Sequence, residues 1–279
     1  MLQLMVLLWE GLAMGVPAGN TGVTGAAGVE PVVRRIRPDQ PWRWLEAGWA
    51  DMRTVPAISL TYGIAFLLAS LSLVAVLLFA NLSALVPVMA AGFLLVGPML
   101  AVGLYEASRR LEAGLPVQLS DVAFVSSRNI SQLAFVGAML AGAMLIWLQV
   151  AGWLFAVFFG AIGIPPLSDF APMLLLTQRG LAMLVIGSAV GGAIAFAVFA
   201  ISAISVPLLL ARDIDAVTAV TTSIRAVRLN FWPMLLWAWI VALLTAFGIA
   251  TWFLGLAVIF PLLGHATWHA QRALVGDGD

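Results

Sequence analysis

ISQLAFVGAMLAGAMLIWLQVAGWLFAVFF, residues Ile130–Phe159, is the stretch that decides the fold class of this sequence. None of its residues is Asp, Glu, Lys or Arg. A helix rises about 1.5 Å per residue and the hydrocarbon core of a bilayer is about 30 Å thick, so about 20 apolar residues are enough to cross it. The stretch therefore predicts a membrane-spanning helix.

Five more runs in the chain contain no charged residue. They are Pro56–Ala80, Ala84–Tyr105, Leu181–Ser205, Phe231–Ile249 and Thr251–Trp268. Of all 279 residues, 63% are hydrophobic and 9% are charged, whereas about 25% are charged in an ordinary soluble domain. We expect an all-α polytopic membrane protein with six transmembrane helices. The net charge is zero and no long basic patch is present, which excludes nucleic acid as a partner.

The arginines indicate how the chain is oriented. All thirteen basic residues are arginine, and twelve of them lie before the first span, between the second and third, between the fourth and fifth, or after the sixth. Arg179 is the exception; it could clamp an anionic headgroup or pair with Asp169. The positive-inside rule predicts that both termini are cytoplasmic.

The six spans divide into three similar units. A short amphipathic stretch precedes each odd-numbered span, at residues 41–53, 120–128 and 214–228, and each even-numbered span contains a proline near its cytoplasmic end, at Pro98, Pro207 and Pro261. Proline can kink a helix there. We predict one membrane domain, residues 36–275, built as three repeats of interfacial helix plus transmembrane hairpin over residues 36–112, 118–213 and 214–275. Residues 1–35 read as a flexible leader, and 276–279 as a tail.

Residues 160–180 interrupt the middle unit. Pro165 and Pro166 are followed by a helix start at Ser168–Asp169 and by a helix end at Thr177–Gly180. A helix of this length is too short to cross the bilayer, so we expect it in the outer leaflet.

Tryptophan and arginine near the ends of the spans are candidates for contact with the membrane interface or with a partner. Trp rings prefer the headgroup level, and Arg on an interfacial helix reaches the same region. The candidates are Trp42, Arg43, Trp44, Trp49, Arg109, Arg110, Arg179, Arg225, Arg228 and Trp268.

Four short motifs resemble a known family: residues 41–45 (PWRWL), 97–98 (GP) with 103–110 (GLYEASRR), 205–210 (SVPLLL) and 265–269 (HATWH). Over residues 34–275 the chain resembles the bacterial integral-membrane family called domain of unknown function 2189. The resemblance implies a polytopic protein of the bacterial inner membrane without an established activity. Some members are labelled as similar to cytochrome c oxidase subunit I. A haem–copper centre needs several histidines, however, and this chain has only His265 and His269.

Few residues could carry chemistry. His265 and His269 are four residues apart on one helix face and could offer two nitrogens to a metal, with Glu106 as a further ligand. The alternative is a pair of interfacial histidines beside Trp268. For Glu106, an ion pair with Arg109 and Arg110 is the simpler interpretation. We therefore predict no enzyme activity, no cofactor and no metal.

Three functions remain open. The first is a non-enzymatic accessory or assembly subunit that binds lipid or a membrane-protein complex. The second is a transporter or channel for a small neutral or apolar solute, with its pathway at the centre of the three repeats. The third, a haem- or metal-binding electron-transfer subunit, depends on His265 and His269 alone.

Overall fold

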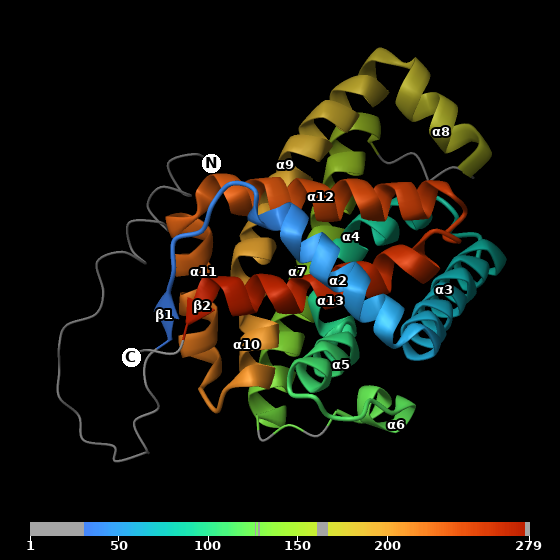
Figure 1. The fold of residues 1–279 in the computed structure, drawn as a ribbon. Helices are drawn as coiled ribbons and strands as arrows, with labels where there is room; N and C mark the ends of the chain where they lie inside the picture. Colours follow the sequence, from blue (N-terminus) through green and yellow to red (C-terminus); the bar gives the residue numbers. More distant parts are fainter. Residues whose placement is uncertain (1–30, 126, 128, 161–166, 277–279) are drawn as a thin grey trace.

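The computed structural model describes residues 31–125, 127, 129–160 and 167–276, and its described part is almost entirely helical (Figure 1). The helices are α2 (Gln40–Thr54), α3 (Pro56–Phe79), α4 (Leu85–Leu100), α5 (Val102–Glu112), α6 (Leu119–Ala123), α7 (Ile130–Phe159), α8 (Leu167–Leu176), α9 (Gln178–Ser202), α10 (Ser205–Ala211), α11 (Ala216–Leu229), α12 (Phe231–Ala250) and α13 (Leu256–Leu274). Two short strands, β1 (Val32–Val33) and β2 (Val275–Gly276), pair antiparallel.

Five helical segments of the described chain are long and apolar enough to cross a membrane. They are Pro56–Phe79, Leu85–Glu112, Ile130–Phe159, Gln178–Ala211 and Phe231–Ala250. These five correspond to the first five spans that the sequence predicts, and α7 has the predicted bounds. The all-α membrane fold is therefore confirmed.

The sixth predicted span, Thr251–Trp268, differs in the structure. Trp252 and Phe253 have φ values of 56° and 66°, a left-handed conformation that breaks a helix, so the last helix begins only at Leu256. Its second half carries His265, His269 and Arg272. This polar half lowers its mean hydropathy, and α13 is not among the five segments above.

Two of the three short helices form as predicted and the middle one is shorter. Asp215 begins α11 by accepting a hydrogen bond from the backbone N–H of Thr218 at 2.9 Å, and the Thr218 hydroxyl donates a second one at 2.6 Å. These bonds hold the pKa of the Asp215 carboxyl below its usual value. The helix predicted over 120–128 is only α6, Leu119–Ala123; Arg128 lies outside the described residues.

Two of the long apolar segments are broken near a proline, whereas α13 continues through Pro261. Ala101 separates α4 from α5, three residues after Pro98. Ala203 and Ile204 separate α9 from α10. Pro207 explains the second break, because its ring clashes with the carbonyl of the residue four positions earlier, Ala203.

The segment after α7 forms a helical hairpin. Helix α8 begins within two residues of the predicted Ser168–Asp169 start. It ends at Leu176, directly before the helix end predicted at Thr177–Gly180. Thr177 also begins α9, because its side chain accepts a hydrogen bond from the N–H of Gly180 at 3.0 Å. Residues 161–166 of the predicted 160–180 segment lie outside the described part.

The two ends of the described chain lie together. Val32 and Val33 of β1 pair with Gly276 and Val275 of β2. Val32 and Val33, at the end of the predicted leader, are thus paired with the other end of the described chain. Residues 1–30 lie outside the described part, and the leader stays a prediction.

Helix α13 lies at the centre of the fold, where α2 crosses it (Figure 1). Gly48 of α2 faces the backbone of Ala266 of α13, and a Cβ added at Gly48 would lie 2.6 Å from the Ala266 nitrogen. The crossing also contains Trp44, whose ring packs edge-on against Trp237 of α12 with centroids 5.5 Å apart. The core therefore depends on a close approach of two backbones.

We expect Gly48→Ala to destabilise the fold, because the added methyl group must push α2 away from α13; overpacking of this kind costs about 1–3 kcal/mol. The matched control is Gly142→Ala in α7, where a Cβ meets nothing within 4 Å. Thermal unfolding in mild detergent measures both. A melting temperature of the Gly48 variant equal to that of the control would contradict the prediction.

Candidate functional site

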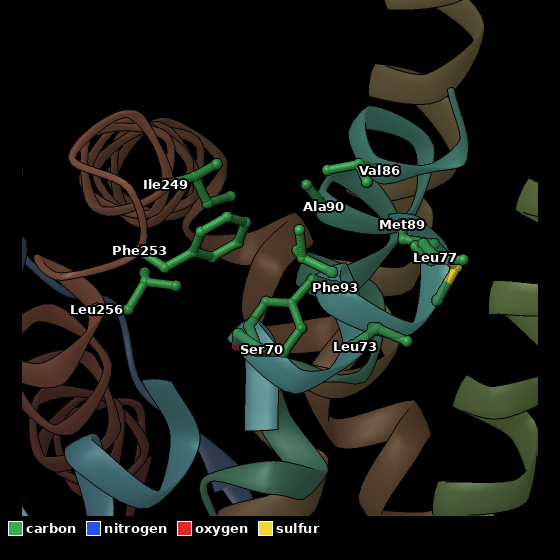
Figure 2. A pocket seen from close by; sticks show the side chains of 11 residues that line it. Ser70, Leu73, Leu77, Val86, Met89, Ala90, Phe93, Ile249, Phe253 and Leu256 are labelled. Carbon is green, nitrogen blue, oxygen red and sulfur yellow. The ribbon is translucent and has the colours of Figure 1, made fainter. Parts of the chain in front are cut away.

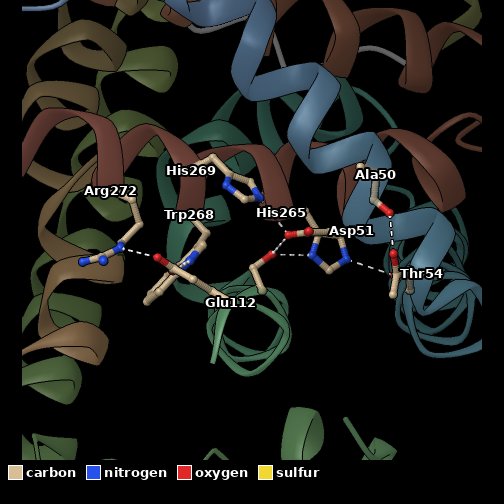
Figure 3. Close-up of polar contacts among 10 residues, drawn as sticks. Ala50, Asp51, Thr54, Glu112, His265, Trp268, His269 and Arg272 are labelled. Carbon is tan, nitrogen blue, oxygen red and sulfur yellow. Dashed lines mark hydrogen bonds and ion pairs between the residues drawn. The ribbon is translucent and has the colours of Figure 1, made fainter. Parts of the chain in front are cut away.

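A cluster of five polar side chains joins three helices, α2, α3 and α5, to α13. Its members are Asp51 of α2, Ser59 of α3, Ser108 of α5, and His265 and His269 of α13. Figure 3 shows Asp51, His265 and His269 where α2 meets α13. We call these five residues the polar cluster.

The polar cluster is one continuous chain of hydrogen bonds. Ser59 Oγ lies 2.9 Å from His265 Nε2, and Ser108 Oγ lies 2.8 Å from His265 Nδ1. Ser108 Oγ donates to Asp51 Oδ2 at 2.6 Å, and His269 Nε2 lies 2.8 Å from the same oxygen.

The direction of the hydrogen bonds follows from the number of protons. Ser108 has one hydroxyl proton and donates it to Asp51, so its oxygen must accept from His265 Nδ1–H. In a neutral ring Nε2 is then an acceptor, and the Ser59 hydroxyl donates to it. The polar cluster thus satisfies both nitrogens of a neutral His265.

Burial decides what the polar cluster can do. Ser59 and His265 are both 0% exposed. A nucleophilic serine has to reach its substrate, and Ser59 is enclosed between α3 and α13. The arrangement therefore stabilises the contact of α2, α3 and α5 with α13, and it offers no reactive hydroxyl to solvent.

His265 and His269 do not form the interfacial pair expected beside Trp268. His265 lies in the core, and only His269, with a side chain 28% exposed, approaches the surface. The two rings bond to different groups, Ser108 and Asp51. Among the described residues, no group of three or more His, Cys, Asp or Glu side chains could hold a metal ion.

Beside the polar cluster, Glu112 of α5 bonds to two residues of α13 (Figure 3). Trp268 Nε1 donates to Glu112 Oε2 at 2.9 Å, and Arg272 Nε donates to Glu112 Oε1 at 2.9 Å. These bonds explain why Trp268 is 2% exposed although its indole N–H is polar.

Glu106 of α5 is buried at 3% exposure with both oxygens occupied. Arg109 donates two hydrogen bonds to it at 2.7 Å, and Arg110 donates one at 3.0 Å. Arg110 also pairs with Asp121 of α6 at 2.9 Å. The structure thus contains the local ion pair expected from the spacing, and Arg110 also connects α5 to α6.

The tryptophans predicted for the interface divide into two groups. Trp42 and Trp49 of α2 are 58% and 43% exposed, whereas Trp44 and Trp268 are 2% exposed. Trp44 and Trp268 are therefore corrected to core residues. Trp44 and Gly48 lie on the buried face of α2. The glycine permits close contact with α13, and this contact encloses Trp44.

The arginines predicted for the interface lie on the surface or close to it. Arg43, Arg179, Arg225 and Arg228 are exposed. Arg109 and Arg110 are partly buried by their pairing with Glu106.

An apolar groove of about 710 Å³ lies between α4, α7, α8, α9 and α12. Helix α9 contributes Gly187, Gly191 and Gly192, and Trp147 of α7 and Trp239 of α12 are further lining residues. Trp147 Nε1 donates to the Val88 carbonyl at 2.8 Å, so this N–H is already satisfied. We call this space the α9 groove; its volume falls within the range of ligand pockets, about 300–1,000 Å³.

A second cavity is too small for a ligand. Figure 2 shows it between Ser70 and Leu73 of α3, Phe93 of α4, and Phe253 and Leu256 near the turn before α13. Its volume is about 40 Å³, which is room for about one water molecule. Ser70 already donates its hydroxyl to the Phe66 carbonyl at 3.0 Å.

Sequence reasoning missed Asp51 and the α9 groove. Asp51 follows Gly48 by three residues and so lies near the buried face of α2. In the sequence, an acid on the same helix face as a glycine is the feature that could have indicated a buried polar contact. For the groove, the available signal was the row of glycines on α9, which leaves space beside a helix unless a neighbour fills it.

We expect Asp51→Ala to destabilise the protein by about 1–3 kcal/mol, because Ser108 and His269 lose their common acceptor. The control is Glu46→Ala, an exposed acid on the same helix. Chemical denaturation in detergent micelles compares the two variants. Equal stabilities would show that the polar cluster contributes nothing to the fold.

No curated protein and no solved structure matches the chain. Residues 85–211, which run from α4 to α10, match the family described as predicted integral membrane protein (DUF2189). This match confirms the resemblance found in the sequence over these residues, and the family's description agrees with the five helical segments that are long and apolar enough to cross a membrane.

Proposed function

We propose that this protein is a non-enzymatic, lipid-binding protein of the bacterial inner membrane, and that it holds a lipid hydrocarbon chain in the α9 groove. The observation that supports the proposal is the groove itself. Helices α4, α7, α9 and α12, which line most of it, belong to four of the five membrane-spanning segments. In a bilayer its surroundings are therefore lipid.

The lining favours a hydrocarbon chain over a polar solute. Its side chains are mostly aliphatic or aromatic, and Ser188 is the single hydroxyl among them. Gly187, Gly191 and Gly192 remove side chains along α9, which lets a chain approach the helix closely. Burying apolar surface in such a groove gains dispersion contacts with a packed wall.

The absence of enzyme activity remains our proposal, and the polar cluster supports it. Ser59 and His265 are enclosed in the core, and Glu106 is neutralised by two arginines. None of these residues lines the α9 groove.

We further propose six crossings, with α13 as the sixth and both termini in the cytoplasm. Pairing of β1 with β2 requires the two ends of the described chain to lie on one side, and only an even number of crossings allows this. Asn230 supports the same arrangement, because its amide bonds to Ile36 N and Arg34 O at 2.9 Å each. The twelve arginines of one side then face the cytoplasm.

The order of the helices agrees with the proposed threefold repeat. Each unit has a short helix, a long apolar helix and a helix that contains proline: α2–α3–α4, α6–α7–α9/α10 and α11–α12–α13. The middle unit has α8 inserted.

The transporter hypothesis has less support from the fold. It placed a pathway at the centre of the repeats, and that region is filled by the buried side chains of α13, among them Ile259, Leu263 and Ala266. Binding to a membrane-protein complex stays a prediction. The exposed Trp42 and Trp49 of α2 are the surface residues that could serve it.

Cysteine labelling tests the topology, because the natural chain has no cysteine. We expect a membrane-impermeant maleimide to label Ser168→Cys in spheroplasts, and to label Glu46→Cys and Ala273→Cys only after lysis. The cysteine-free protein is the control for background. Labelling of Ala273→Cys in unlysed spheroplasts, with Glu46→Cys protected, would indicate five crossings.

Filling the groove tests lipid binding. A Cβ at Gly192 meets nothing within 4 Å, so we expect Gly192→Leu to fold and to occupy the space of the lipid chain. Native mass spectrometry of the detergent-purified protein should show less bound lipid for this variant. Gly142→Leu, in equally open space outside the groove, is the matched control. If both variants retain the lipid of the natural protein, the proposal is wrong.

A further inference from the structure

We propose that the lipid in the α9 groove is an anionic phospholipid whose phosphate is bound by Arg179. This inference rests on the proposed function and adds the class of headgroup to it. Three observations carry it: the course of the groove along α9, the position of Arg179 on that helix, and the lack of a partner for Arg179 in the described part of the chain.

The groove runs along most of α9. Its lining residues on this helix extend from Met183 to Phe199, which is about 24 Å at 1.5 Å per residue. One leaflet of the hydrocarbon core is about 15 Å deep. The groove is therefore long enough to hold a phospholipid acyl chain over its whole length, even where α9 is tilted.

Arg179 lies one helical turn before the first of these lining residues on α9. Arg179 and Met183 are four positions apart, so they share a face of α9. Side chains on a helix lean toward its N-terminus, and the guanidinium therefore extends away from the apolar lining and beyond Met183. Phe170 and Leu174 of α8 also line this end of the groove. The cation thus lies where the headgroup of a chain seated in the groove would be.

Nothing in the described residues neutralises Arg179. Its side chain is exposed, and it forms no ion pair or hydrogen bond with them. Asp169, in the first turn of α8, accepts a hydrogen bond from Ser168 at 3.3 Å and does not pair with Arg179. Arg109 and Arg110, by contrast, are paired with Glu106.

Guanidinium suits the phosphate of a lipid. Its planar N–H groups form two parallel hydrogen bonds with phosphate oxygens, and it is less strongly hydrated than an ammonium group. Because Arg179 is a single uncompensated cation beside an apolar channel, a net negative headgroup is favoured over a zwitterionic one. Phosphatidylglycerol has both a net negative headgroup and acyl chains.

The experiment compares phosphatidylglycerol with phosphatidylcholine of the same acyl chains. Full-length protein is delipidated in detergent, each lipid is added back, and native mass spectrometry measures the bound fraction. We expect tighter binding of phosphatidylglycerol by the natural protein. Arg179→Gln should weaken it about tenfold, since a hydrogen bond to a charged group is of that order, and should bring it to the level of phosphatidylcholine. Arg179→Lys should retain part of the preference.

The control for charge is Arg53→Gln, which removes an exposed arginine of α2 and should leave the preference unchanged. Equal binding of the two lipids by the natural protein, unchanged in Arg179→Gln but reduced in Gly192→Leu, would overturn the headgroup proposal and keep the lipid-binding one. Loss of the preference in Arg53→Gln as well would also overturn it, because the effect would then be one of net charge. Failure of every lipid to bind the natural protein would overturn both proposals.

Discussion

The close crossing of α2 and α13 at Gly48 and Ala266 is the constraint on which the rest of the structure depends. A backbone approach this short is possible only because Gly48 has no Cβ. It brings Asp51, three residues further along α2, within hydrogen-bond distance of Ser108 and His269. Trp44, four residues earlier, reaches Trp237 of α12. One contact therefore positions both an apolar and a polar part of the core.

Many polar groups in the described core are satisfied by each other, although Trp44 Nε1 and both polar atoms of the Gln271 side chain are buried without a hydrogen-bond partner. Unpaired polar groups cost several kcal/mol in hydrocarbon. His265 uses both nitrogens, Glu106 uses both carboxylate oxygens, and Glu112 accepts from Trp268 and Arg272. His265 and Glu106 are candidates for chemistry in the sequence, and in the structure their partners give them a structural role.

The sequence predicts the apolar helices well, because the length of an apolar run is a local property. Ile130–Phe159 agrees with α7 at both ends. Contacts between distant segments are not local, and here prediction failed. Tryptophan is typical of a membrane interface, but Trp44 and Trp268 are core residues here. The close contact at Gly48 lets Trp44 pack inside, and Glu112 accepts the indole N–H of Trp268. Likewise, nothing near Val32 in the sequence shows that it pairs with Gly276.

The helices around α13 and the helices around the α9 groove are held together by different kinds of contact. Around α13, helices α2, α3 and α5 are tied by the polar cluster, by Glu112 and by a close backbone contact, so this half has little freedom to open. Around α9, the walls are apolar side chains and glycines, and the helices that line the groove are joined there by packing and a single Trp147 hydrogen bond. A binding site requires space that packing has left unfilled, and within the described residues the α9 groove provides about 710 Å³ of it. The polar cluster and the proposed lipid site therefore involve different helices: the cluster joins α2, α3 and α5 to α13, whereas α4, α7, α8, α9 and α12 line the groove.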